Sequence, residues 1–263
     1  MKTAICLYGT TGYTHSLANN LNNRKPLNVV EPLSSLLENI ASINKSDIFV
    51  HSWSIDKEEE VNKILQPKDK LFQNFKIFDK DPWINSVKSR FYSQYKSNYL
   101  MKFYANENNV KYDFVMHVRL DLIWFSKFNF FELNPQKLYV SNWNISEKRD
   151  SSEPDISNDN NNLGPFDRSN YGVGVALMDH WFLSNYKNMN LFSTLYENIK
   201  FIEMINWLNN FKSNRTLKNK NFYNPLHLTY IHAKRLQIEI EYIKYRGYDY
   251  DLYRRFKNPN YFK

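Results

Sequence analysis

Three short stretches of this chain carry polar side chains where buried strands are expected to end. Residues 113–125 read DFVMHVRLDLIWF, an apolar run that holds Arg119 and Asp121 two positions apart. Burying either group without a partner costs several kcal/mol, so the two must be paired, exposed at the end of the strand, or bound to a ligand. The simple structural interpretation is an ion pair between them, although residues this near in the chain are too close for the usual facing geometry.

A functional interpretation of the same two residues follows from strand geometry. On a strand, Arg119 and Asp121 point to the same side. There a carboxylate could hold a divalent cation and a guanidinium could clamp a diphosphate. A transferase that expels a nucleoside diphosphate needs this charge neutralisation at its leaving group.

The other two stretches lie nearer the N-terminus. The apolar run at 3–8 stops at a turn that reads GTTG, from Gly9 to Gly12, and a second run, IFVHSW, ends in His51, Ser52 and Trp53. The turn lacks the lysine of a P-loop and the six-residue dinucleotide fingerprint, so an ordinary turn is its alternative reading. Its glycines would still let backbone amides approach a ligand closely.

The elements that position these residues alternate between strands and helices. Hydrophobic periodicity predicts helices at 32–43, 58–65 and 84–105, strands at 3–8, 48–53, 75–79, 113–119, 137–143 and 238–245, and a polar surface loop at 145–163. Most of the chain after residue 180 is expected to be helical. This alternation predicts an α/β fold, a mainly parallel sheet flanked by helices. We expect one domain over 1–263, with a nucleotide-binding half at 1–125 and an acceptor-side half at 126–263. Ligands of such sheets bind outside the carboxyl ends of the strands, so the three polar stretches should meet at one edge.

Composition narrows the function classes. The chain is 42% apolar and 17% aromatic, which excludes a disordered protein, and Cys6 is its single cysteine, which excludes an intramolecular disulfide and predicts a core thiol. The net charge of +8 is spread without a dense basic block, so we expect no nucleic-acid partner. Apolar runs are too short for a signal peptide or a membrane span, so we expect a cytoplasmic protein, in the host cytoplasm if viral.

Five stretches, in order over residues 3–180, resemble a group of bacterial and giant-virus glycosyltransferases of the GT-A fold, often linked to capsule or surface glycans. The stretches are ICLYGTTG, DIFVHSW, SRFYSQYKS, YDFVMHVRLDL and FDRSNYGVGVALMD. The resemblance implies a Rossmann-like fold, a nucleotide-sugar donor and a glycan or other hydroxyl acceptor. A non-catalytic nucleic-acid or glycan-binding module stays the alternative. A phosphate-handling hydrolase is a third possibility, which should show more clustered acidic or histidine ligands.

The resemblance also assigns roles around the donor. Gly9, Thr10 and Thr11 would line the nucleotide, although the family's first turn usually carries Gln and Arg where Thr10 and Thr11 stand. The other positions expected to bind the nucleotide sugar are His51, Arg90, Gln94 and Arg119. Arg90 and Gln94 lie one helical turn apart and would face the base, ribose or phosphates.

The metal and the acceptor side follow from the same resemblance. Asp121 stands where these enzymes place the last aspartate of their Asp-x-Asp motif, with Arg119 in place of the first, so Asp121 is the expected ligand of a Mn²⁺ or Mg²⁺ ion. Asp167 is the candidate carboxylate that deprotonates the acceptor hydroxyl. Asp179 is interpreted as a helix cap. His227 and His232 are interpreted as structural, although this fold can recruit a late histidine as a metal ligand.

Overall fold

The computed structural model of the 263-residue chain describes residues 1–11, 27–141, 166–167, 175–202, 224–243 and 249–253. The polar run at 145–163, predicted as a loop, lies outside these ranges, as does Gly12. For Asp167 the structure describes the backbone alone. In the described ranges, no helix combines the length and the apolar character that crossing a membrane requires.

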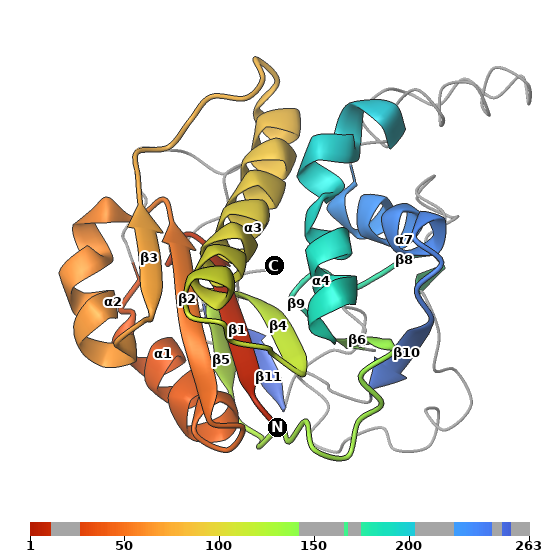
Figure 1. Cartoon of the computed structure of the whole chain (residues 1–263). Helices are drawn as coiled ribbons and strands as arrows, with labels where there is room; N and C mark the ends of the chain where they lie inside the picture. The colour runs from red at the N-terminus through yellow and green to blue at the C-terminus, as the bar shows by residue number, and fades with distance from the viewer. Residues whose placement is uncertain (12–26, 142–165, 168–174, 203–223, 244–248, 254–263) are drawn as a thin grey trace, which may run out of the picture.

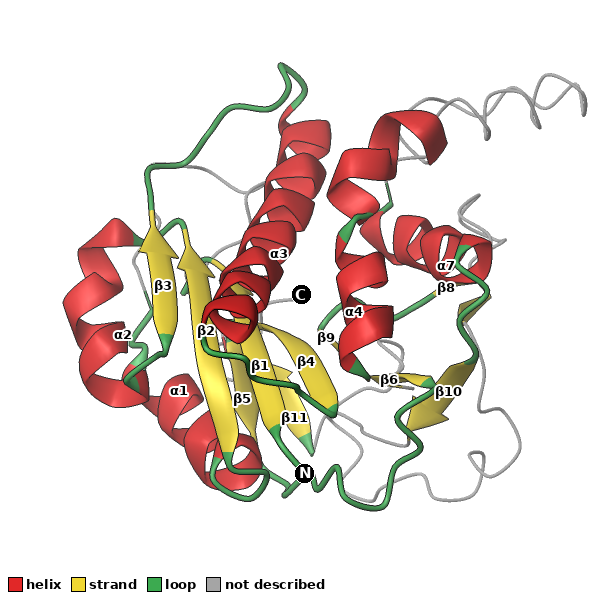
Figure 2. Ribbon diagram, viewed as in Figure 1, coloured by secondary structure: helices red, strands yellow, loops and turns green. Residues whose placement is uncertain are grey.

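A seven-stranded sheet runs through the middle of the molecule (Figures 1 and 2), in the order β10-β6-β9-β4-β1-β2-β3. Neighbouring strands are parallel except at β9, which is antiparallel to both β4 and β6. The prediction of an α/β fold with a mainly parallel sheet is therefore confirmed. The strands are β1 (Thr3–Gly9), β2 (Ser46–Ser52), β3 (Asp69–Phe72), β4 (Phe114–Arg119), β6 (Leu138–Ser141), β9 (Trp181–Ser184) and β10 (Ile240–Ile243).

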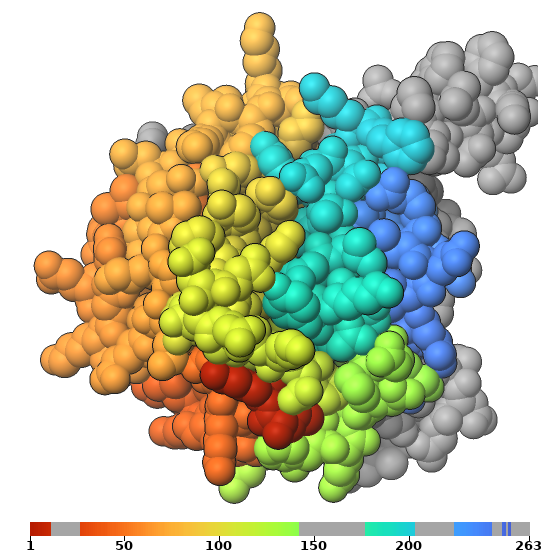
Figure 3. All heavy atoms as spheres, in the orientation of Figure 1, coloured from red at the N-terminus to blue at the C-terminus, as the bar shows by residue number. Residues whose placement is uncertain are grey.

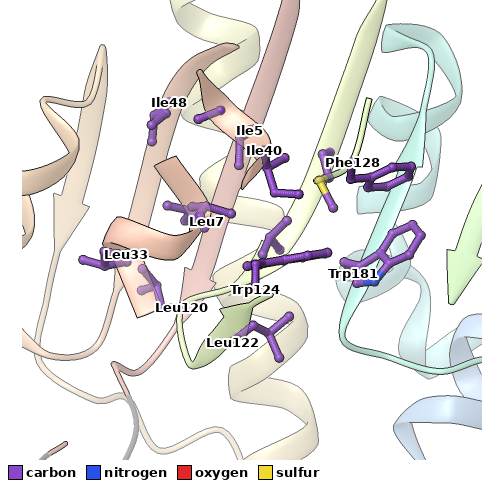
Figure 4. Packing of buried hydrophobic residues seen from close by; sticks show 14 of the residues in the cluster. Ile5, Leu7, Leu33, Ile40, Ile48, Leu120, Leu122, Trp124, Phe128 and Trp181 are labelled. Carbon is purple, nitrogen blue, oxygen red and sulfur yellow. The ribbon is translucent and has the colours of Figure 1, made fainter. Parts of the chain in front are cut away.

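Helices cover both faces of the sheet. Successive side chains of a strand point to opposite faces, and in the central strands the residues on both faces are apolar. On β1, Cys6 belongs to a core cluster with Met101 of α3, whereas Leu7 packs with Leu33 of α1 on the opposite face (Figure 4). Burial raises the pKa of the Cys6 thiol well above its ordinary value, as expected for a core residue. The helices are α1 (Val30–Leu36), α2 (Glu58–Leu65), α3 (Pro82–Glu107), α4 (Tyr186–Ser193), a helix at 195–202, and α7 (Pro225–Arg235).

Of the described residues after position 180, α4, the helix at 195–202 and α7 are helical as predicted, but these residues also supply strands β9, β10 and β11. In Figure 3, α3 and α4 lie side by side over one face, and Asn98 of α3 donates a hydrogen bond of 2.8 Å to Asn190 of α4. Two short antiparallel pairs lie outside the large sheet: β5 (Leu122–Trp124) with β11 (Tyr250–Leu252), and β7 (Phe166–Asp167) with β8 (Val175–Ala176).

The third strand differs from the prediction. Residues 75–79 were expected to form it, but they belong to an irregular segment, and β3 is formed by Asp69–Phe72 instead. Hydrogen bonds to β2 fix this choice, from the Lys68 amide to the Ile48 carbonyl (2.8 Å) and from the Gln73 amide to the Ser52 carbonyl (3.1 Å). The helix predicted at 32–43 also differs, because α1 passes into a π-helical turn at Leu37–Ala41.

The order of the strands reverses at one position in the sheet. The chain runs outward from β1 through β2 to β3, and then returns to place β4 on the other side of β1. Ligands of open α/β sheets bind where the strand order reverses in this way, outside the carboxyl ends of the strands. The reversal point of this sheet lies between the carboxyl ends of β1 and β4.

Helix α3 begins close to this end of the sheet. Asp81 caps it by accepting hydrogen bonds from the amides of Trp83 (2.8 Å) and Ile84 (3.2 Å), and Pro82 occupies its first turn. Both features favour a helix start at this point. Because its start is fixed, the first half of α3 carries its side chains over the carboxyl ends of β1, β2 and β4.

Candidate functional site

Tyr8, His51 and Arg119 form a row across the ends of three parallel strands. Tyr8 of β1 pairs in register with His51 of β2 on one side and with Arg119 of β4 on the other. Side chains alternate along a strand, and Cys6 and Phe49, two residues earlier on β1 and β2, pack in the cluster under α3. The row therefore faces α3, at the edge where the sequence placed the three polar stretches.

Arg119 and Asp121 form a bidentate ion pair at the end of β4. Arg119 donates from Nε to Oδ1 (2.8 Å) and from Nη2 to Oδ2 (2.6 Å) of Asp121. The chain turns at Leu120, whose amide donates to the Tyr8 carbonyl, and the turn brings the two side chains face to face. The expectation that they are too close in the chain for this geometry was wrong. The Arg119 side chain is 19% exposed and that of Asp121 is 5% exposed.

A second arginine–aspartate pair lies beside the first. Arg90 of α3 pairs through Nη1 with the carboxylate of Asp179 and donates through Nη2 to the Asp179 carbonyl. The Tyr8 hydroxyl donates to the same carbonyl (3.4 Å), and the Arg119 amide donates to the carbonyl of the next residue, His180 (3.2 Å). The interpretation of Asp179 as a helix cap was wrong, because β9 follows it and its carboxylate serves Arg90.

Electrostatics link the two pairs. Burial lowers the pKa of Arg90; Tyr8 opposes this shift, while the positive charge of Arg119 adds to it. The Arg90 Nε atom is buried and has no hydrogen-bond partner in the described part of the chain. Two guanidinium groups and two carboxylates therefore lie together around Tyr8, and one buried N–H donor among them lacks an acceptor.

The first turn uses its backbone donors internally. The Gly9 amide donates to Ser93 Oγ (2.7 Å), and the Thr11 amide donates to Ser54 Oγ (3.2 Å). Gly9 has a φ of 103°, which favours glycine, while Thr10 is half-buried. The turn thus lies at the predicted edge, but two of its amides are held by serine side chains.

His51 lies beneath this turn and is fully buried. Its Nδ1 lies 2.6 Å from Ser93 Oγ and its Nε2 lies 2.9 Å from Gln73 Nε2, which fits a neutral ring with the proton on Nδ1. Burial lowers the pKa of His51 to about 3, and the charges of Lys96 and Lys76 act in the same direction. His51 therefore supports the turn through Ser93 and has no surface of its own for a ligand.

Gln94 points away from the edge, although it is one helical turn from Arg90. Its Nε2 donates to Nδ1 of His117 (2.9 Å), and His117 donates from Nε2 to Oδ1 of Asn98 (2.9 Å). Burial lowers the pKa of His117 to about 3, so the ring is neutral. This buried chain joins α3 to β4, and the expectation that Arg90 and Gln94 share a ligand does not match their positions.

The described residues do not fit a divalent cation. Both oxygens of Asp121 accept hydrogen bonds from Arg119, and the described ranges contain no group of three His, Cys, Asp or Glu side chains arranged as metal ligands. His232 is buried in α7, where its Nε2 donates to the Leu191 carbonyl (3.3 Å) and burial lowers its pKa to about 4. It is structural, as interpreted. A Mn²⁺ or Mg²⁺ ion stays a prediction, without an evident ligand in Asp121.

Sequence reasoning missed two residues of the site, Tyr8 and Ser93. It also missed the ion pair between Asp179 and Arg90. Tyr8 reads as the last apolar residue of a strand, and Ser93 as a small residue on a helix. The one available signal was the series of serines in SRFYSQYKS, which marks the face of α3 that approaches the sheet. Asp167 pairs with Val175 between β7 and β8, and its side chain is not among the described atoms.

A hollow of about 300 Å³ lies elsewhere, beside the amino end of β2. Its lining includes Ser46, Asp47, Lys45 and Lys68. Asp47 is already engaged there, with Lys68 at 3.9 Å and with the Tyr112 hydroxyl at 2.8 Å. We assign the candidate site to the carboxyl edge of the sheet, because the two arginine–aspartate pairs lie together there, beside the point where the strand order reverses.

Comparisons with known proteins add a likeness in overall form only. No protein-family model and no curated protein sequence matches the chain. A solved structure, the nucleoside-diphosphate-sugar pyrophosphorylase from Vibrio cholerae RC9, superposes with a TM-score of 0.46 at 9% identity, over 97% of this chain and 96% of the other. A likeness at this level carries no functional argument, so the function is argued from the residues of the site.

Proposed function

We propose that this protein is a glycosyltransferase that takes a sugar from a nucleoside diphosphate sugar. The observation that carries the proposal is the meeting of Arg90 and Arg119 at the reversal point of the sheet. Nucleotides bind at this position in open α/β sheets, and arginine forks match the geometry of phosphate oxygens. The ordered motifs that resemble GT-A glycosyltransferases support the choice of a sugar nucleotide over other phosphorylated ligands.

The proposed reaction is a displacement at the anomeric carbon of the donor sugar. The acceptor hydroxyl oxygen forms a bond to that carbon, the bond from the carbon to the diphosphate breaks, and the diphosphate leaves with the electron pair. A carboxylate takes the proton of the hydroxyl, and Asp167 is our candidate for this base. The arginines stabilise the negative charge that develops on the leaving group.

The remaining predicted residues receive more modest roles. Gly9 and Thr10, both half-buried, are our candidates to line the nucleotide. His51 and Gln94 act as positioning residues. The ring of His51 is hydrogen-bonded to Ser93, and the side-chain amide of Gln94 is hydrogen-bonded to His117, both inside the protein. Asp121 acts through Arg119, whose guanidinium it orients.

The finer expectations belong to the same proposal. A glycan of a bacterial or viral surface as acceptor rests on the motif resemblance, and a cytoplasmic location rests on the shortness of the apolar runs in the sequence. The two-halves division at residue 125 likewise stays a prediction.

Thermal unfolding with a panel of nucleotide sugars tests the proposal. Uridine, guanosine and thymidine diphosphate sugars, each with and without manganese, should include at least one that raises the melting temperature. A ligand at about a hundred times its dissociation constant adds roughly 2.7 kcal/mol to the free energy of unfolding. The active donor should then release its nucleoside diphosphate in the presence of a glycan mixture. A flat melting temperature across the panel, with stabilisation by an oligonucleotide or a glycan alone, would support a binding module instead.

A further inference from the structure

The irregular segment that joins β3 to α3 exposes apolar side chains. Ile77 is 84% exposed, Phe75 is 45% exposed, and Trp83, in the first turn of α3, is 49% exposed. Figures 1 and 2 show this segment, residues 73–83, rising beyond the carboxyl ends of the strands, and in Figure 3 it projects from the surface of the molecule. Exposed apolar residues scattered singly are normal in proteins, whereas several on one projecting segment mark an interaction site.

Polar contacts hold the backbone of this projecting segment. At one end the Gln73 amide donates to the carbonyl of the last residue of β2 (3.1 Å). At the other end Asn85 Oδ1 accepts hydrogen bonds from the amides of Phe78 (2.6 Å) and Asp79 (3.2 Å). The segment therefore presents Ile77 outward from an anchored backbone, and little conformational entropy is lost when a partner covers it.

Lysines accompany the apolar side chains of the projecting segment. Lys76 and Lys80 are both exposed. The two carboxylates of the segment are engaged within the protein, because Asp79 pairs with Lys88 at 2.9 Å and Asp81 caps the first turn of α3. The charges that the segment offers to a partner are therefore those of its lysines, and they are complementary to an anionic surface.

The shape and composition of the projecting segment fit a lipid surface better than a groove on another protein. Lysine is depleted at the cores of protein–protein interfaces. At a membrane, in contrast, Trp, Phe and aliphatic side chains settle at the boundary between headgroups and acyl chains, while lysines contact anionic headgroups. A fluid bilayer also accepts a projecting tip without a preformed pocket.

We propose that the projecting segment docks this protein on an anionic lipid surface. Ile77 and Phe75 enter the boundary of the acyl chains, and Lys76 and Lys80 lie among the headgroups. Such docking is independent of the proposed transferase activity, and it places the protein on the bilayer rather than across it. The carboxyl edge of the sheet then faces the lipid, because the projecting segment rises beyond that edge.

Sedimentation of the full-length protein with lipid vesicles tests the proposal. Vesicles with about a third of their lipid as phosphatidylglycerol should bind at least about tenfold more strongly than vesicles of phosphatidylcholine alone, and added salt should weaken this binding. Ile77→Asp should weaken binding to the anionic vesicles by about tenfold or more, and Lys80→Gln by about fivefold. Phe103→Asp is the matched control, since Phe103 is 52% exposed on α3 but lies about 30 Å from the start of that helix. It should leave binding within about twofold of the wild type, because its charge lies several screening lengths away.

A fluorescent label shows whether the tip enters the lipid. Cys6 is buried and is the single cysteine of the chain, so an environment-sensitive dye attached to an Ile77→Cys variant reports on that position alone. Its emission should move to shorter wavelength when anionic vesicles are added, whereas the same dye on a Phe103→Cys variant should show no such change. An unshifted dye at position 77, or an Ile77→Asp variant that binds vesicles as the wild type does, would overturn the proposal. So would a dimer in light scattering that Ile77→Asp dissociates, with no vesicle binding by the wild type, because a second copy of the chain would then cover the segment.

Discussion

Arg119 and Asp121, separated by one residue, face each other across the turn after β4, with Nε 2.8 Å from Oδ1 and Nη2 2.6 Å from Oδ2. The pairing satisfies the requirement that buried charges have partners. A binding role is compatible with this pairing, because the Arg119 side chain stays 19% exposed and lies next to the pair of Arg90 and Asp179. One ion pair can thus meet both a folding need and a binding role.

Asp121→Ala should lower the free energy of unfolding by about 3 kcal/mol, because it removes the bidentate ion pair of the mostly buried Arg119. Urea denaturation at neutral pH measures this change. The double variant R119M/D121L should recover most of the loss, since an apolar pair removes the stranded charge. The double variant should nevertheless bind no nucleoside diphosphate. A single variant as stable as the wild type would show that the ion pair does not form in solution.

Ser93→Ala should destabilise the protein by about 2–3 kcal/mol, because Ser93 Oγ accepts from the Gly9 amide and bonds to Nδ1 of His51. Ser97→Ala is the matched control on the same helix. Ser97 is also buried, but its hydroxyl donates to the Gln94 carbonyl one turn earlier, and its loss should change stability by less than about 1 kcal/mol. Equal effects of the two substitutions in chemical denaturation would contradict the bridging role of Ser93.

Stability should fall as the pH is lowered from about 6.5 toward 4. Burial lowers the pKa of both His51 and His117 to about 3. In the unfolded chain these rings bind protons near pH 6.5, so acid favours the unfolded state while the folded rings stay neutral. Their contribution is complete above about pH 6.5, and each ring removes up to about 1.4 kcal/mol per pH unit below it.

His117→Gln should reduce this pH slope by about one histidine's share, whatever its effect on absolute stability. Asn98→Ala is the control, because it breaks the hydrogen bond from His117 Nε2 while leaving the ring in place. The slopes come from urea denaturation at several values between pH 6.5 and 4.5. An unchanged slope in His117→Gln would mean that the folded ring is protonated in this range.

The sequence predicted the fold well where local pattern decides the structure. The apolar runs of β1, β2 and β4 and the charged helix at 58–65 were placed correctly, because their periodicity is strong. The third strand was misplaced, since FKIFD has more strand character than DKLF at 69–72. Hydrogen bonds to β2 select the second segment, and a pairing partner twenty residues away leaves no local signal.

In the candidate site too, local sequence pattern predicted some features, whereas contacts between distant residues determined others. The clustering of Gly9, His51 and Arg119 at one edge follows from parallel strands, and the sequence predicted it. The pairing of Arg90 with Asp179 joins residues 89 positions apart, so neither residue type nor spacing could indicate it. Gln94 was misassigned because helical spacing states which residues share a face, but not which partner that face meets.

A crystal structure of the protein with a nucleoside diphosphate would show where the diphosphate binds. We expect the two phosphate groups between the ends of β1 and β4, in contact with the guanidinium groups of Arg90 and Arg119. We expect the nucleoside beside the turn at Gly9. A diphosphate bound instead in the hollow at the amino end of β2, near Lys45 and Lys68, would contradict a donor site at the carboxyl edge.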